Sequence, residues 1–193
     1  MDPVVKAYEA HAQEFLRGRD KSPIGAQVVD QWSRTLRPGA SVIELACGGG
    51  YPITRILYAA GLQLCAVDSS PTLVAKFQSR FPAIPVQCAR VQESDRFDRT
   101  YEAAVAIGLI FLLSESDQSR LITKVSKIVV PRGRFLFTAP IERGNWTDMS
   151  TGVECRSLGQ ASYEALLREG GFRVVATITD EGANNYYDVE RTR

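Results

Sequence analysis

The chain has 193 residues, 45% of them hydrophobic, with 23 Lys and Arg against 22 Asp and Glu. This composition can bury one sizeable core, so we expect one domain over residues 1–193. The balanced charge leaves no basic field for nucleic acid. No apolar stretch is long enough to span a bilayer, and the polar N-terminus does not resemble a signal peptide. The four cysteines have no paired spacing, which favours a reduced cytoplasm and no disulfide or metal site.

Helical and strand patterns alternate along the chain. Apolar spacing predicts helices over 4–16 and 24–36, separated by a polar stretch that we expect to be mobile. Ser70 followed by Pro71 is typical of a helix start. A further helix is expected directly after the glycines at 48–50. The remaining predicted helices cover 71–80, 117–130 and 160–169, and the predicted strands cover 41–46, 63–67, 84–88, 101–108, 134–139, 172–179 and 186–193.

This alternation predicts a doubly wound α/β fold, with a mostly parallel sheet of seven strands and helices on both faces. The last two strands flank a polar turn at 180–185 and are expected to form an antiparallel pair. Pro131-Arg132-Gly133 is expected to stop the helix that precedes the fifth strand.

One segment, 42–57, reads VIELACGGGYPITRIL and joins a strand, a glycine turn and a helix. Glu44 lies near the end of the strand, and Gly48, Gly49 and Gly50 form the turn. Free backbone N–H groups at such a turn can hold a nucleotide-like cofactor. Asp68 ends the next strand, at a spacing that suits an acceptor for ribose hydroxyls. The alternatives are a plain strand-to-helix turn for the glycines and a helix N-cap for Asp68.

The run from Glu44 to Gly50 resembles the S-adenosylmethionine motif of class I methyltransferases, an acid followed by three alternating glycines. Ala46 replaces the first glycine, and its methyl group permits a close backbone approach at negative φ. The resemblance covers nearly the whole chain and is closest to small bacterial enzymes that act on small molecules. It implies S-adenosylmethionine as cofactor, S-adenosylhomocysteine as product, and an antiparallel last strand. It also implies an N-terminal helical lid, 1–36, over a cofactor-binding core, 37–193.

The resemblance places cofactor contacts after several strands and in the lid. Arg90 stands where the usual acid after the third strand is missing, and it either stacks on the adenine or is a solvated surface residue. An arginine of the lid, for which we choose Arg19, would pair with the cofactor's carboxylate. The cofactor-binding candidates are Arg19, Glu44, Ala46, Cys47, Gly48, Gly50, Asp68, Ser69, Arg90, Val91 and Ile107.

The acceptor is expected beside the apolar run after the fourth strand and beside the segment 141–159, since loops at this edge build pockets. Leu112 stands where relatives carry a histidine. His11 and Tyr186 are the candidates for a general base, with a solvated helix position as the alternative for His11. A hairpin turn with left-handed Asn residues is the alternative for 184–185. The candidates for binding the substrate are Tyr8, Leu109, Phe111, Trp146 and Asn185.

The sequence therefore predicts a methyltransferase (EC 2.1.1 class) with a small-molecule acceptor, no metal, and no nucleic-acid or membrane partner. Oxygen is the first guess for the acceptor atom, on family frequency alone. One alternative is an NAD(P)-dependent oxidoreductase, but the third glycine of the dinucleotide fingerprint is missing and Pro52 lies in the first helical turn. Another is a cofactor-binding protein without turnover, which Ala46, the missing acid after the third strand and the missing histidine at Leu112 keep open. The oligomeric state is not encoded in any motif.

Overall fold

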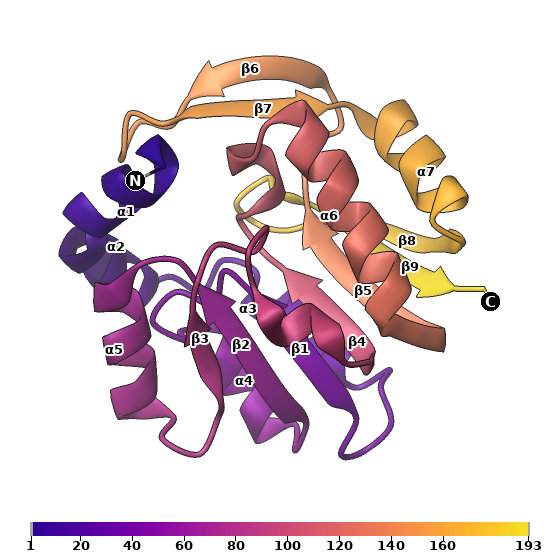
Figure 1. The fold of residues 1–193 in the computed structure, drawn as a ribbon, viewed down its shortest axis with the longest axis horizontal. Helices are drawn as coiled ribbons and strands as arrows, with labels where there is room; N and C mark the ends of the chain where they lie inside the picture. Colours follow the sequence, from indigo (N-terminus) through magenta and orange to yellow (C-terminus); the bar gives the residue numbers. More distant parts are fainter. Residues whose placement is uncertain (1, 193) are drawn as a thin grey trace.

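The computed structural model describes residues 2–192 and is built on a seven-stranded sheet with the order β3-β2-β1-β4-β5-β9-β8 (Figure 1). The five strands β3, β2, β1, β4 and β5 are parallel to one another, whereas β9 runs antiparallel to both β5 and β8. The predicted fold class, with its antiparallel last strand, is confirmed. The strands are β1 Ser41–Leu45, β2 Gln63–Asp68, β3 Val86–Cys88, β4 Tyr101–Ala106, β5 Val129–Thr138, β8 Phe172–Thr179 and β9 Asn185–Arg191.

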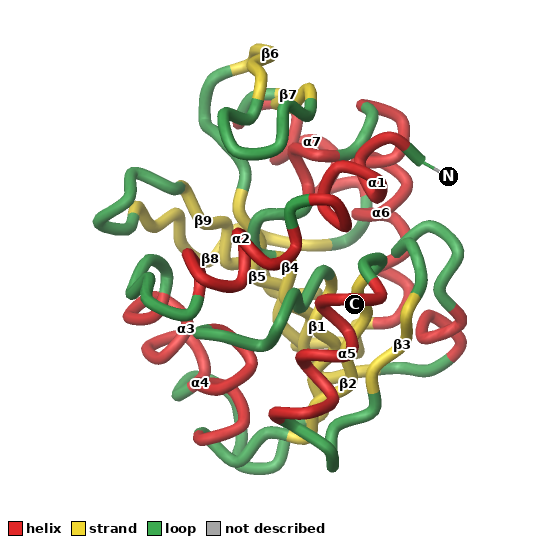
Figure 2. The backbone as a smooth tube through the Cα atoms, turned by 90° about the vertical axis from the view of Figure 1, so that its left-hand side faces the viewer, coloured by secondary structure: helices red, strands yellow, loops and turns green. Residues whose placement is uncertain are grey.

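Helices cover both faces of this sheet (Figure 2). On one face, α3 (Ala26–Ser33), α4 (Ile53–Ala59) and α5 (Pro71–Arg80) bury apolar side chains such as Val29 and Phe77. On the other, α6 (Glu115–Ile128) and α7 (Gln160–Glu169) bury side chains such as Ile122 and Leu167. Each such buried side chain stabilises the fold by about 1.5–3 kcal/mol. The two apolar clusters hold the carboxyl ends of the strands in a fixed frame.

Local hydrogen bonds determine where the helices begin. The hydroxyl of Ser70 accepts from the N–H of Leu73 at 3.2 Å, which caps α5 as its sequence predicts. Ser114 caps α6 by accepting from the N–H of Asp117 at 3.1 Å, so this helix begins two residues before the predicted 117. The predicted stop at 131–133 is wrong, because α6 ends at Ile128 and β5 begins at the next residue. A register shift in β5 absorbs the proline, with Arg132 at a φ of 65°.

The predicted first helix is two helices, α1 (Pro3–Ala10) and α2 (Ala12–Arg19), separated at His11. Helix α2 therefore extends into the polar stretch that was expected to be mobile. Helix α3 packs in the core, so α1 and α2 alone lie over the carboxyl ends of the strands (Figure 1). We call residues 3–19 the lid.

Residues 141–159 were expected to be a loop, but they contain a separate antiparallel hairpin, β6 (Arg143–Thr147) and β7 (Glu154–Leu158). This hairpin arches across the same end of the molecule toward the lid (Figure 1). All five residues of β6 are exposed, so its sequence lacks the apolar alternation that marks a strand. Within residues 2–192, no helix has the length and apolar character needed to cross a membrane.

Candidate functional site

A cavity of about 710 Å³ lies between the carboxyl ends of the strands, the lid and the β6–β7 hairpin. This volume is typical of sites that bury a cofactor or a small ligand. Glycines and polar side chains line the part beside β1 and β2, whereas apolar side chains line much of the rest. The predicted cofactor-binding residues that line the cavity are Arg19, Ala46, Gly48, Asp68, Ser69, Arg90, Val91 and Ile107.

Asp68 connects the glycine loop to the start of α5. Its carboxylate accepts the N–H of Gly48 at 2.8 Å and that of Ser70 at 2.9 Å. Burial raises the pKa of Asp68, and the backbone hydrogen bonds from Ser70, Gly48 and Ser69 oppose that shift. Because Ser70 caps α5, Asp68 is free of the N-cap role and turns to the cavity. Its remaining lone pairs are available to hydroxyl donors such as those of a ribose.

The glycine loop has three residues in the left-handed region. Gly48 and Gly50 have φ values of 56° and 87°, and Ala46 has a φ of 60°. The negative φ considered for Ala46 is therefore wrong, and the alanine carries a strain of roughly 1–2 kcal/mol. Gly50 does not line the cavity, since a side chain there would meet the ring of Phe81. Its contact is with the core, and any cofactor contact at Gly50 or Cys47 stays a prediction.

An acidic and a basic side chain, Glu44 and Arg19, line an adjoining cavity of about 40 Å³, which Cys47 also lines. Glu44 is 3% exposed and accepts a hydrogen bond from Thr54 at 2.7 Å. Burial raises the pKa of Glu44 to about 8, although the hydrogen bond from Thr54 acts in the opposite direction. Arg19 lines both cavities and makes one weak hydrogen bond, to the carbonyl of Ile24 at 3.4 Å. Burial lowers the pKa of Arg19, and nearby Tyr186, Asp180 and Glu44 oppose this.

Neither Glu44 nor Arg19 takes part in an ion pair within the described chain. Burial keeps the proton on Glu44 until a cation comes near, and the half-buried guanidinium of Arg19 lacks a counter-ion, so this pair is suited to a ligand that carries both an ammonium and a carboxylate. An α-amino acid group has a carboxylate for the guanidinium and an ammonium for the carboxylate. The residues therefore fit the methionine end of S-adenosylmethionine.

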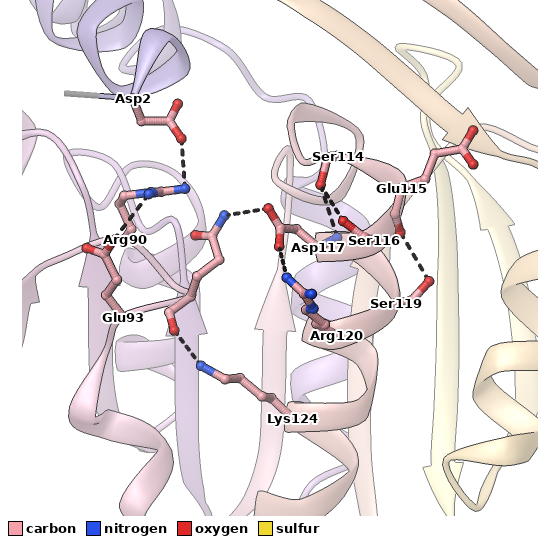
Figure 3. Close-up of polar contacts among 11 residues, drawn as sticks. Asp2, Arg90, Glu93, Ser114, Glu115, Ser116, Asp117, Ser119, Arg120 and Lys124 are labelled. Atoms are coloured by element: carbon pink, nitrogen blue, oxygen red, sulfur yellow. Dashed lines mark hydrogen bonds and ion pairs between the residues drawn. The ribbon is translucent and has the colours of Figure 1, made fainter.

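The loop after β3 is held at the other end of the cavity by polar contacts (Figure 3). Arg90 pairs with Asp2, the N-cap of α1, at 2.7 Å and with Glu93 at 3.1 Å. The side-chain amide of Gln92 donates to Asp117 at 3.4 Å, and Lys124 donates to the backbone carbonyl of Gln92 at 2.6 Å. Arg90 is thus ion-paired and also lines the cavity. Stacking on an adenine remains a prediction.

Hydrogen bonds and an ion pair join the lid and the residue after it to both ends of helix α5. Glu9 accepts hydrogen bonds from the hydroxyls of Ser70 and Thr72, and these bonds lower the pKa of Glu9. At the other end, Arg80 pairs with Asp20 and donates to the carbonyl of Gly49 at 2.8 Å. The lid therefore rests directly on the cap of α5 and on the glycine loop.

The substrate candidates divide into two groups. Tyr8, Leu109 and Phe111 line the cavity. Trp146 lies outside it, with its ring 5.6 Å from that of Phe111. Asn185 is also outside the cavity, and its side-chain carbonyl accepts from the hydroxyl of Thr179 at 3.0 Å.

The turn after β8 differs from its predicted form. Ala183, with a φ of 60°, is its left-handed residue rather than Asn184. Asn184 lines the cavity, and Asp180 holds it by accepting from its backbone N–H at 2.9 Å.

Neither candidate for a general base is a free base in this cavity. His11 lies outside the lining, with Nδ1 2.9 Å from the carbonyl of Ala7. Tyr186 lines the cavity, but its hydroxyl donates to Asp180 at 2.9 Å. Burial raises the pKa of Tyr186, and Asp180 adds to the shift, so the phenol stays protonated near neutral pH.

A buried amide that the sequence reasoning missed joins two walls of the cavity. Gln118, fully buried in α6, donates to the carbonyls of Leu113 and Arg156, each at 3.0 Å. Its carbonyl accepts from the hydroxyl of Tyr163 at 2.7 Å, and that hydroxyl accepts from the N–H of Leu158 at 3.2 Å. Only a polar residue at an apolar position of the α6 helical pattern could have signalled this role.

Comparison with known proteins gives a consistent family. Residues 42–133 match the family described as a methyltransferase domain. A probable S-adenosylmethionine-dependent methyltransferase of Mycobacterium tuberculosis is 29% identical over 154 residues, 78% of this chain and 55% of the relative. Malonyl-[acyl-carrier protein] O-methyltransferase of Anoxybacillus flavithermus is 28% identical over 109 residues, 54% of this chain and 40% of the relative. The chain thus spans 40% to 55% of the length of these curated relatives.

Two solved structures share the fold over nearly the whole chain. Magnesium protoporphyrin IX methyltransferase from Synechocystis PCC 6803, with bound S-adenosylmethionine, has a TM-score of 0.78 at 13% identity and covers 100% of this chain and 98% of its own. The 1,6-didemethyltoxoflavin-N1-methyltransferase of Burkholderia thailandensis, with S-adenosylhomocysteine, has a TM-score of 0.78 at 16% identity, over 99% and 88%. These two methyltransferases share the fold of this chain, and residues 42–133 match the methyltransferase domain family.

Proposed function

We propose that this chain transfers a methyl group from S-adenosylmethionine to a small-molecule acceptor. The observation that carries the proposal is the pair Arg19 and Glu44 beside the glycine loop, since neither side chain forms an ion pair with another described residue. Asp68 lies further along the same cavity as an acceptor for ribose hydroxyls. Together the three side chains match the amino acid end and the sugar of the cofactor.

S-Adenosylmethionine, when bound, supplies an electrophilic methyl carbon, and its sulfur leaves as a neutral thioether. In this proposal the chain contributes alignment and exclusion of water. Leu109, Phe111 and Val153 form an apolar wall, and the lid covers the opposite side, where Glu9 accepts from the hydroxyl of Thr72. Holding two reactants in line can remove roughly 7–11 kcal/mol of the barrier.

The acceptor atom follows less directly from the site. Oxygen is our first choice on family frequency alone, and the relatives named above include both an O- and an N-methyltransferase. Because Tyr186 is a protonated donor and His11 lies outside the cavity, the site favours a phenol, thiol or amine, which need no strong base, over an aliphatic alcohol. A cytoplasmic location and the absence of nucleic-acid and membrane partners stay predictions.

Thermal melting with S-adenosylmethionine, S-adenosylhomocysteine and NADH in parallel tests the cofactor. A ligand at about 100 times its Kd adds about 2.7 kcal/mol, which is a rise in Tm of roughly 5–10 °C for a chain of this size. We expect the rise with the first two ligands, and Asp68→Asn should abolish most of it. Asp98→Asn removes an exposed carboxylate and is the matched control.

Two results would contradict the proposal. A rise with NADH alone would favour the oxidoreductase alternative. Binding of S-adenosylmethionine without release of S-adenosylhomocysteine, across a panel of phenols, thiols and amines, would favour a binding protein without turnover.

A further inference from the structure

We propose that Asp148, in the β6–β7 hairpin, selects an acceptor with a cationic or uncharged polar group on an apolar body, and that the site rejects organic acids and phosphate esters. This inference rests on the proposed function and names the substrate class of the same cavity. It follows from which charged groups of the cavity already have partners.

The cations of the cavity offer no free partner to an anionic acceptor. Three arginines line it, and two of them are already paired. Arg90 pairs with Asp2 at 2.7 Å, and Arg156 pairs with Glu154 at 2.9 Å. The third, Arg19, lies at the glycine loop, where the carboxylate of the cofactor would occupy it. A carboxylate or phosphate on the acceptor would therefore enter the cavity without a counter-ion, which costs free energy.

Among the carboxylates of the cavity, in contrast, one away from the glycine loop has no cationic partner within the described chain and can bind a ligand. Asp117 has Arg120 within 3.5 Å, and Asp68 is held by two backbone N–H groups. Asp148 is half-buried and has no cationic partner among the described residues. Its Oδ1 accepts from the N–H groups of Ser150 and Thr151 at 3.0 and 2.8 Å, whereas its Oδ2 accepts no hydrogen bond from the part of the chain described. One carboxylate oxygen is thus left for a ligand donor.

The turn that carries Asp148 is held in shape by its own hydrogen bonds. The N–H of Asp148 donates to Val153 at 2.8 Å, and the N–H of Gly152 donates back to Asp148 at 2.8 Å. The hydroxyl of Thr151 adds a third bond to Oδ1 at 2.9 Å. A preorganised carboxylate loses little conformational entropy when it binds a donor.

Tyr8 lines the same cavity and is close enough to both Asp148 and Asp68 to be affected by their charges. Burial raises the pKa of Tyr8 most, and the charges of Asp148, Cys155 and Asp68 raise it further, so the phenol lies within electrostatic reach of both aspartates. Its hydroxyl makes no hydrogen bond with another described residue, and its ring packs on Phe15 at 5.8 Å. An acceptor between the apolar wall and Tyr8 would therefore meet a neutral hydroxyl and the carboxylate of Asp148. An amine or hydroxyl satisfies both groups, whereas an acid is repelled by the second.

Chemical-shift titrations of the isotope-labelled protein, loaded with S-adenosylhomocysteine at near-neutral pH, test this with three probes of similar shape: benzylamine, benzyl alcohol and benzoate. Because Asp148 is half-exposed, we expect a modest effect, with benzylamine binding about two- to fivefold more tightly than benzoate. The shifts should centre on Thr151 and Gly152. Asp148→Asn should remove the preference, whereas Glu142→Gln, which removes an exposed carboxylate just before the hairpin, should keep it.

Benzoate binding as tightly as benzylamine, or a preference for benzylamine that survives Asp148→Asn, would overturn the inference. The initial titration with S-adenosylhomocysteine alone tests the proposed function separately, because Asp148 takes no part in holding the cofactor. The same probes are also titrated into the protein without S-adenosylhomocysteine, where Arg19 is open to benzoate, so the charge preference of the hairpin is then taken from the shifts of Thr151 and Gly152 alone.

Discussion

The two halves of the cavity are built in different ways. The half that fits the cofactor is made by the ends of β1 and β2 in the centre of the sheet, where Glu44 and Asp68 are 3% and 7% exposed. The half that faces the acceptor is made by helix α1 of the lid and by a separate hairpin whose β6 strand is entirely exposed, with Met149 in its turn 97% exposed. The core therefore fixes Glu44 and Asp68, helix α2 of the lid adds Arg19, and the periphery can vary the acceptor's partners at little cost in stability.

The two halves meet at few points. The lid reaches the cofactor half through Glu9, which accepts from the hydroxyl of Thr72, and through Arg19, which lines both cavities. The hairpin is held to the body by Gln118, by Tyr163 and by the contact between Phe111 and Trp146. If these halves are independent, changes in one should leave the other unaffected, and each prediction below tests that separation.

The largest expected effect lies in the cofactor half. Arg19→Gln removes the cation that we assign to the cofactor's carboxylate, and charge-assisted bonds of this kind are worth about 1.5–3 kcal/mol each. Calorimetry should show S-adenosylhomocysteine binding on the order of 100-fold more weakly. Affinity for adenosine, which lacks the amino acid end, should be unchanged. Arg17→Gln, in the same helix but exposed, is the control. An equal loss for adenosine would contradict the assignment.

The pH dependence of binding tests Glu44 next. The raised pKa of about 8 means that the folded protein keeps a proton that the unfolded chain releases near pH 4.5, so the free energy of unfolding falls as pH rises between those values. An ammonium ligand favours the ionised carboxylate. Affinity for S-adenosylhomocysteine should therefore rise on the order of tenfold from about pH 6 to about pH 8, with proton release. Glu44→Gln should flatten this rise; a rise that persists would implicate another group.

Gln118→Leu should act on the acceptor half alone. It removes the side-chain donor to the carbonyls of Leu113 and Arg156 and the acceptor for the hydroxyl of Tyr163, at a cost of about 1–3 kcal/mol in the free energy of unfolding. The expected fall in Tm is roughly 2–12 °C. Hydrogen exchange should quicken at Leu158, whose N–H donates to Tyr163. Affinity for S-adenosylhomocysteine should stay within about twofold. A parallel loss of that affinity would show that the halves are coupled.

The smallest effect is expected at the strained alanine of the glycine loop. Ala46→Gly relieves a φ of 60° and should raise the free energy of unfolding by about 0.5–1 kcal/mol, or Tm by roughly 1–4 °C. Ala183→Gly relieves the same φ in the turn between β8 and β9 and should stabilise the protein similarly. Only Ala46→Gly should also change the affinity for S-adenosylhomocysteine. Identical binding by both variants would mean that Ala46 is not part of the cofactor site.

Much of the cofactor half was predictable from the sequence because its signals are local. Gly48 and Asp68 each follow a strand whose apolar run is unmistakable, and parallel strands bring their ends together at one edge. Arg19 could be chosen only through the resemblance to a known family. Ala46 shows where local prediction fails, because the loop holds its backbone at a φ of 60° against the ordinary preference of alanine.

The acceptor half was much less predictable. The exposed residues of β6 have no apolar period, so the hairpin was read as a loop, and Trp146 and Asn185 were placed in a cavity that they do not line. The roles of Gln118 and Asp148 depend on partners that are distant in the sequence or on the lack of a partner, and neither property leaves a pattern along the chain.

The sequence by itself determined the order of the strands and helices, the antiparallel last strand and the cofactor motif, because each depends on residues that lie within one turn or one strand of each other. The tertiary structure alone decided which charges are paired, where the hairpin lies and which candidate side chains reach the cavity. Those outcomes depend on the packing of segments such as the lid and β7, which are separated by more than a hundred residues, and no local pattern specifies them.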